Sequence, residues 1–137
     1  MKFVSKYLAI KLKEKGFDKP CFGYYQEDEF ILNITSIHLP FGGNVVDTMI
    51  RHRGENDIVD APTIEQVLEW LREEKNIIVT VGTFTNVSMS RFVIKIIQIV
   101  DKDSLTEHFL KGCIEKFYVN YDDAILAGIE YVVEHLI

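Results

Sequence analysis

The segment from Arg91 to Val100 constrains the fold most strongly, because apolar side chains occupy both of its faces. The two faces carry Phe92, Ile94 and Ile96, and Val93, Ile97 and Ile99. This two-residue period predicts a β-strand. Such a strand either lies in the centre of a sheet covered on both faces, or is covered on one face and meets a partner on the other.

Two β-hairpins are expected in the chain. Ile77–Phe84 is a β-rich run that leads through the polar turn Thr85–Ser90 into the strand just described. Earlier in the chain, strands are predicted at Cys21–Gln26 and Phe30–Leu39, joined by an exposed acidic turn. That turn lacks the Asn-Gly pair typical of a tight hairpin.

The first helix is predicted from Val4 to Lys15, where apolar residues recur at helical spacing. Gly16 suits the left-handed position after a helix C-terminus. Phe17 would then contact Leu12, as in a Schellman motif. The helix is therefore expected to end sharply at this glycine.

Two further helices have clear N-terminal signals. Thr63 with Gln66 forms a capping box at the start of a helix that continues to Lys75. Asn120 precedes two acidic residues and starts the last helix, which is expected to run to about Leu136. Helices that alternate with hairpins predict an α+β fold, in which an antiparallel sheet from two hairpins packs with about three helices.

The chain of 137 residues fits a single α+β domain spanning 1–137. Two segments stay open. Residues 40–60 are irregular: Gly42-Gly43-Asn44 is interpreted as a turn, and Val45–Ile50 as a short helix or strand. In residues 104–119, Ser104 with Glu107 favours a helix, whereas the later part is equally compatible with a strand.

Charge is unevenly distributed along the chain. Fifteen Lys and Arg stand against 21 Asp and Glu, a net charge of -6, yet residues 1–19 alone carry +4. The rest therefore carries -10, which makes nucleic acid an improbable partner. The chain has neither a secretory signal nor an apolar stretch of membrane-spanning length, so a cytoplasmic protein without a membrane partner is expected.

Three blocks of the chain form a familiar set. They are Leu12–Cys21 with Tyr24; Ala61–Thr63 with Gln66, Leu68, Trp70–Glu73 and Asn76–Ile77; and Tyr121–Ala124 with Ala127–Ile129. Together they cover roughly half of the chain and resemble a family of short uncharacterised proteins encoded by phages, prophages and mobile elements of gut bacteria. The shared residues describe helix caps and packing, so the resemblance implies neither an activity nor site residues.

The sequence contains no spacing that indicates a catalytic centre. No histidine lies three to five residues from another or near a cysteine, so neither a metal site nor a cofactor is predicted. Cys21 and Cys113 are expected to be buried free thiols. Tyr24 and Tyr25, near the N-terminal lysines, are the candidates for stacking on nucleic-acid bases, although core packing explains them more simply.

One constellation could bind a ligand. Arg51 and Arg53 flank His52, and Gly54 follows them in a polar loop. Arginine can bind a phosphate or carboxylate through two hydrogen bonds, and histidine can exchange a proton near neutral pH. The loop is therefore a candidate anion-binding site; the alternative is a surface loop whose own charges neutralise one another.

Three functions follow from these observations. The first is a non-enzymatic accessory protein of a phage or mobile element, which binds another protein or associates with itself. A homodimer is expected, because excess apolar strand surface often pairs between subunits. The second is a small enzyme or anion-binding protein that uses the loop around His52. The third is an acidic inhibitor of a host nucleic-acid enzyme.

Overall fold

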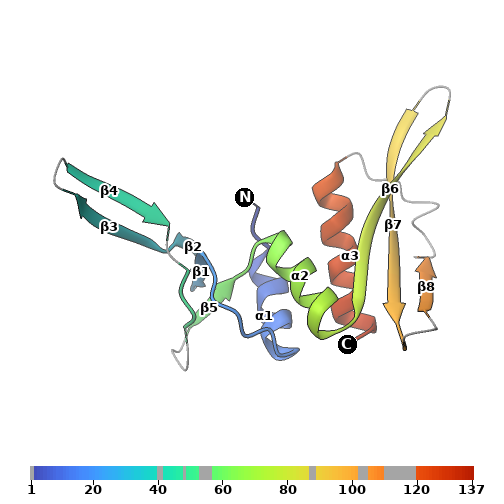
Figure 1. Cartoon of the computed structure of the whole chain (residues 1–137), viewed down its shortest axis with the longest axis horizontal. Coiled ribbons are helices and arrows are strands. Elements are labelled where there is room, and N and C mark those ends of the chain that lie inside the picture. Colours follow the sequence, from blue (N-terminus) through green and yellow to red (C-terminus); the bar gives the residue numbers. More distant parts are fainter. Residues whose placement is uncertain are drawn as a thin grey trace. The chain divides into compact units, whose positions relative to one another are not determined.

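The computed structural model describes residues 2–39, 42–47, 49–52, 57–86, 89–101, 105–109 and 120–137. The chain divides into two compact units, Met1–Ile64 and Glu65–Ile137. Figure 1 shows their elements coloured along the sequence. Each unit is described by itself below.

The first unit contains one helix and a small antiparallel sheet. The helix is α1 (Lys6–Glu14), and the sheet has the strand order β2-β1-β5. Its strands are β1 (Gly23–Gln26), β2 (Glu29–Leu32) and β5 (Ile58–Ala61). A separate two-stranded hairpin joins β3 (Ile34–Leu39) to β4 (Gly42–Asp47).

Helix α1 is capped by a side chain at its N-terminus and by backbone hydrogen bonds at its C-terminus. The Ser5 hydroxyl accepts a hydrogen bond from the Leu8 N–H at 3.3 Å. At the other end Gly16 has φ +93°, and Phe17 N–H donates to Leu12 O at 2.9 Å. These contacts confirm the predicted Schellman motif.

The first hairpin differs from its prediction in two places. Glu27 and Asp28 form a tight two-residue turn, with Glu27 at φ 55°, although the Asn-Gly pair is missing. The Lys6 ammonium donates to the Glu27 carbonyl and lies 3.0 Å from the Asp28 carboxylate, which stabilises this turn.

The predicted strand Phe30–Leu39 is wrong as a single element, because it breaks at Asn33. The Asn33 side chain is buried, and its Nδ2 donates to Cys21 O at 2.9 Å. A buried amide needs such a partner, so it anchors the chain here and the following strand leaves the sheet.

Part of the segment left open between residues 40 and 60 is also β-structure. Gly42 and Gly43 are not a turn, as the sequence interpretation had it; they pair with Leu39 and His38 as the first residues of β4. Strand β5 closes the segment by pairing with β1. Glycine permits an extended backbone as readily as a turn, which is why the pair misled the interpretation.

Helix α1 packs against β5, and a short backbone bridge ties the N-terminus to the end of that strand. Val4 N–H donates to Pro62 O at 3.0 Å, and Ile64 N–H donates to Lys2 O at 2.9 Å. The buried hydrophobic residues among the described part of the unit come from the N-terminal segment, the helix, the segment after it, β5 and the start of α2; they are Val4, Leu8, Ala9, Leu12, Phe17, Cys21, Ala61 and Ile64.

The second unit contains the rest of α2 (Ile64–Glu74), which starts directly after Thr63, and α3 (Tyr121–His135). Its sheet has the order β6-β7-β8, with β6 (Ile77–Asn86), β7 (Met89–Ile99) and β8 (Leu105–Phe109). The doubly apolar strand is therefore central in its sheet, as predicted, but among the described residues it is not covered on both faces. In the segment 104–119, for which the sequence allows a helix or a strand, residues 105–109 form a strand, and 110–119 lie outside the described residues.

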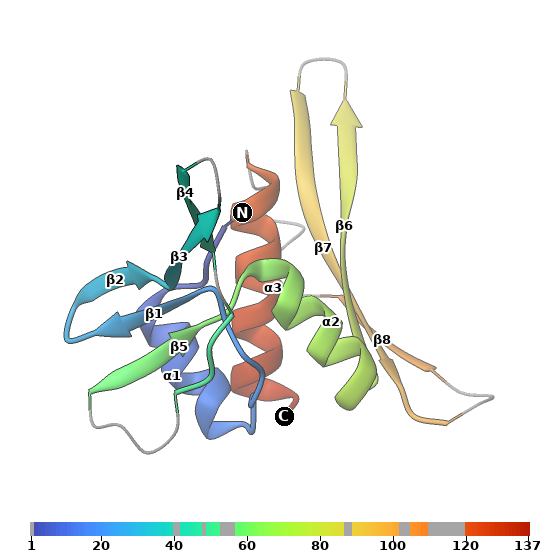
Figure 2. The same cartoon turned by 60° about the vertical axis from the view of Figure 1, so that its left-hand side comes forward.

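Helix α3 covers one face of this sheet and runs beside β6 and β7 in both ribbon views (Figures 1 and 2). Its Asn120 cap accepts from the Asp122 N–H at 2.8 Å, as predicted. The covered face buries Val79, Ile94 and Ile96. On the other face Ile78, Val93 and Ile97 are half-buried, and Ile99 is exposed.

The α+β class is confirmed, with three helices among the described residues and strands that pair antiparallel. The two expected hairpins are present, but they lie in separate sheets. The single domain 1–137 stays a prediction beside the division into two units.

Candidate anion-binding site

The site lies in the first unit, where β1 and β5 pair next to the segment 49–52. Tyr24 of β1 and Asp60 of β5 are directly opposite in the antiparallel register, so their side chains share one face of the sheet. Cys21 and Ile50 exchange two backbone hydrogen bonds of 2.8 Å. This bridge brings His52, two residues further on, to Asp60.

Asp60 binds His52 twice. Its Oδ1 lies 2.6 Å from Nδ1 of the imidazole, and its Oδ2 accepts from the His52 backbone N–H at 2.9 Å. Both side chains are mostly buried, with 14% and 15% of their surface exposed. The Tyr24 ring packs on the imidazole with centroids 4.6 Å apart.

This arrangement determines which ring nitrogen of His52 carries the hydrogen that faces Asp60. An ionised carboxylate can only accept hydrogen bonds, so Nδ1 carries the hydrogen that points to Asp60. Nε2 is then the nitrogen that can accept a hydrogen bond from a ligand when the ring is neutral, or donate one when it is protonated. The structure gives it no partner among the described residues.

A small cavity lies beside this pair. Its volume is about 70 Å³, and its lining residues are Ala9, Lys13, Phe17, Asp18, Lys19, His52 and Asp60. The lining combines two lysines and an imidazole with the buried apolar side chains of Ala9 and Phe17. Lys13 makes no ion pair with any other residue in the described ranges, so its charge is available to a ligand.

The three residues of the predicted loop have different places. His52 lines the cavity. Arg51 does not line it, because its Nη1 lies 2.9 Å from the Asp18 carboxylate and bonds the Asp18 carbonyl at 3.4 Å. Arg53 lies outside the described residues. The predicted loop therefore contributes His52 to the cavity directly. Arg51 contributes only through its contact with Asp18, which lines the cavity.

Cys21 lies near this site but is not a nucleophile. Its side chain is fully buried, and its Sγ donates to Lys19 O at 3.4 Å. Burial, helped by the negative charge of Asp60, raises the pKa of Cys21 to about 12. The thiol is therefore protonated at neutral pH, consistent with the expected buried free thiol. Cys113 lies outside the described residues.

Four residues of the site were not predicted: Lys13, Lys19, Tyr24 in this role, and Asp60. A carboxylate within the apolar strand Ile58–Ala61 was the available signal for Asp60, because a charge on a half-buried strand needs a partner.

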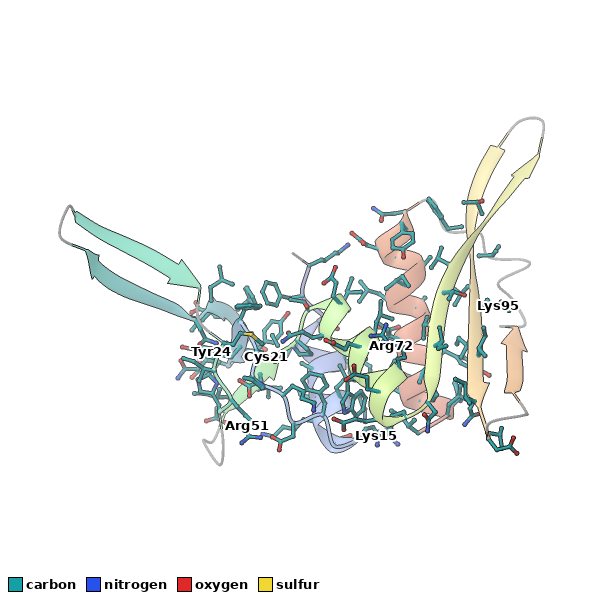
Figure 3. All side chains as sticks on the ribbon, in the orientation of Figure 1. Lys15, Cys21, Tyr24, Arg51, Arg72 and Lys95 are labelled. Carbon is teal, nitrogen blue, oxygen red and sulfur yellow. The ribbon has the colours of Figure 1, made fainter. Side chains whose placement is uncertain are left out.

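Tyr24 and Tyr25 are half-buried; Tyr24 contacts His52, and Tyr25 Oη donates to Val4 O at 2.7 Å. Figure 3 shows Cys21, Tyr24 and Arg51 gathered in the first unit.

No protein-family model matches this chain, and no curated protein or solved structure gives a significant match. Within the described ranges, no group of three histidine, cysteine or acidic side chains is arranged to hold a metal ion. Nor does any helix of the described residues have the length and apolar character needed to cross a bilayer.

Proposed function

We propose that the protein is a non-enzymatic binding protein whose first unit holds a small oxyanion, a phosphate or carboxylate group, in the cavity beside His52. One observation carries the proposal. An imidazole whose Nδ1 is held by Asp60 lines a cavity together with Lys13 and Lys19. The two ammonium groups can donate hydrogen bonds to an anion, and the fixed imidazole adds a further donor, Nε2–H, when the ring is protonated.

The local charges favour an anion. Lys13, Lys19 and Arg51 carry three positive charges, and Asp18 and Asp60 carry two negative ones. The balance is +1 with a neutral imidazole and +2 with a protonated one. The Arg51 contact neutralises Asp18, and the His52 contacts engage both oxygens of Asp60. Neither carboxylate therefore pairs with Lys13, which has no ion pair among the described residues.

The size of the cavity limits the ligand. Pockets for drug-sized molecules measure about 300–1,000 Å³. The cavity here, about 70 Å³, has room for a few water molecules or one small oxyanion group. A larger molecule would have to present such a group to the cavity and leave its remainder outside.

The chemistry of the site supports binding rather than turnover. A nucleophile acting with the His52–Asp60 pair would need an accessible, readily ionised group near the imidazole. Cys21 does not meet this need, because its thiol is buried, is bonded to a backbone carbonyl and has a raised pKa. His52 is therefore assigned to ligand binding.

Calorimetric titration with inorganic phosphate, and separately with acetate, tests the proposal. Lys13→Ala removes one cation from the cavity and is expected to weaken phosphate binding about tenfold, the effect of one charge-assisted hydrogen bond. Lys11→Ala is the matched control, because Lys11 is on the same helix, pairs with Glu14 and does not line the cavity. Equal affinity of both variants, or no binding of either anion, would refute the proposal.

His52→Asn provides a second variant. Asparagine keeps a side-chain N–H near the position of Nδ1 but has no equivalent of Nε2, so phosphate affinity should fall while the contact to Asp60 is partly retained. A denaturation curve of the same variant separates a loss of binding from a loss of folding.

A role in protein–protein interaction is the second candidate, and β2 favours it. Two large apolar side chains, Phe30 and Leu32, are exposed along this four-residue strand. The origin in a phage or mobile element and the identity of any partner protein stay predictions from the sequence.

A further inference from the structure

Strand β2 lies at the edge of the first unit's sheet, with β1 on one side and no strand of the described residues paired on the other (Figure 2). Its side chains Phe30 and Leu32 are 39% and 41% exposed. Natural edge strands are usually protected by lysine, proline or a bulge. Among Glu29–Leu32 the single charged residue is the first, so the strand lacks this protection.

The hydrogen-bond pattern shows which backbone groups face outward. Asn33 N–H donates to Phe22 O at 2.7 Å, which continues the ladder from β2 to β1. In an antiparallel pair, alternate residues bond to the neighbour, so residues 29, 31 and 33 bond inward. Phe30 and Leu32 therefore direct their N–H and C=O groups away from β1, and the structure gives these groups no partner among the described residues.

We propose that β2 pairs with β2 of a second copy of this chain, antiparallel and centred on Ile31. In this register Phe30 of each copy is opposite Leu32 of the other, and each such pair exchanges two backbone hydrogen bonds. The two three-stranded sheets then become one continuous sheet. The same edge supplies both halves of the interface, as a twofold axis requires.

Charge determines the direction of pairing. Glu27, Asp28 and Glu29 make the start of β2 acidic, and among the described residues Asp28 alone of the three has an ion pair, with Lys6. A parallel pair would place the acidic ends of the two copies side by side, which is unfavourable. In the antiparallel register Glu29 instead faces the neutral Asn33 of the other copy.

The apolar side chains favour a second copy over an unrelated strand. Residues directly opposite in a sheet share a face, so the exposed ring of Phe30 would pack on Leu32 of the other copy. On its own chain Phe30 already contacts Phe3, with centroids 4.6 Å apart, and Tyr25 at 5.4 Å. The ring is therefore held in place before association. Because β2 is short, the dimer should be concentration-dependent.

A cysteine cross-link tests the register. Across the twofold axis, the two Ile31 residues form a pair without hydrogen bonds, whose Cα atoms lie about 4.5 Å apart. A disulfide can span that distance. In a Cys113→Ser background, Ile31→Cys should form a disulfide-linked dimer under mild oxidation. Leu32→Cys is the control. The two Leu32 residues of the dimer are not directly opposite but diagonal to each other, about 7–8 Å apart.

Light scattering tests the association without engineered cysteines. The wild-type protein should approach twice the 15.9 kDa chain mass as its concentration rises. Leu32→Lys adds a charge at an exposed position, so it should fold normally and remain monomeric. A wild-type monomer at millimolar concentration, a dimer that Leu32→Lys leaves unchanged, or equal cross-linking of the two cysteine variants would overturn the proposal.

Discussion

The Asp60 carboxylate contacts the imidazole Nδ1 of His52 at 2.6 Å and the backbone N–H of the same residue at 2.9 Å. One side chain therefore determines both the position of the segment 49–52 and the orientation of the ring. Such a double contact would link folding to the proposed anion binding, because the group that holds the segment 49–52 also orients Nε2.

Replacing Asp60 should destabilise the first unit. Asp60→Asn removes the charge from two hydrogen bonds of a mostly buried pair, so the free energy of unfolding should fall by about 1.5–3 kcal/mol. Urea denaturation measures this change. Asp28→Asn is the control, because the Asp28 side chain is 99% exposed and its ion pair with Lys6 contributes little. Equal losses in both variants would contradict the structural role assigned to Asp60.

Alkaline pH should destabilise the fold through Cys21. Its pKa is raised from 9.0 to about 12 in the folded protein, so the unfolded chain loses this proton first. The stabilising contribution is fully present below pH 9 and is lost as the pH rises from 9 towards 12, by up to about 1.4 kcal/mol per pH unit. Burial also raises the pKa of Tyr25, which adds a loss of the same sign above its ordinary value of 10.0.

Chemical denaturation at several pH values between 9 and 12 measures this slope. Cys21→Ser replaces the thiol by a hydroxyl that does not ionise in this range, so the slope should become shallower and the part due to Tyr25 should remain. An unchanged slope in this variant would show that Cys21 is not the titrating group.

Gly16 should tolerate no other residue without cost. Its φ of +93° is unfavourable for residues with a Cβ, although a Cβ built there meets no atom within 4 Å. Gly16→Ala should therefore destabilise the protein by about 1–2 kcal/mol through backbone strain alone. Gly82→Ala serves as the comparison, because its Cβ would lie 3.5 Å from Val93 in ordinary contact. Thermal unfolding of both variants should show a lower midpoint for Gly16→Ala only.

Gly128 should be essential to the packing of α3 on its sheet. A Cβ at this position would lie 2.7 Å from Val79 Cγ1 and 2.9 Å from Ile94 Cγ2. Gly128→Ala should cost about 1–3 kcal/mol, because the helix must move away from the strands. Adding Val79→Ala makes room for the new methyl group. In a double-mutant cycle, the second substitution should therefore cost less in the Gly128→Ala background than in the wild type; simple additivity would argue against this close contact.

Local signals predicted the helices and the second hairpin well. The signals at the helix ends depend on neighbouring residues only. Helix α1 ends before Gly16 and Phe17, α2 begins after Thr63, and α3 begins after Asn120, as these residues predict. The alternation of apolar residues in Arg91–Val100 predicted a central strand as one of two arrangements, and β7 is central in its sheet. The break at Asn33 was missed, because its cause is a hydrogen bond to Cys21, twelve residues away.

The candidate site was only partly predictable. His52 was singled out for its arginine neighbours, whereas its partners come from α1 and β5 and are brought near by the bridge between Cys21 and Ile50. The pairing of β1 with β5 creates this proximity, and no short motif records it. The sequence also suggested that Arg51 faces a ligand, but its guanidinium is bound to Asp18.

Nitrogen NMR of the His52 side chain during a phosphate titration tests the central claim most directly. We expect the Nε2 resonance of His52 to shift in a saturable manner, with a much smaller change at Nδ1, and the response to weaken in Lys13→Ala but not in Lys11→Ala. His135, which contacts Glu134 and Tyr131 and does not line the cavity, is the internal control. If His52 did not respond to phosphate, or shifted no more than His135, the cavity would not be an anion site.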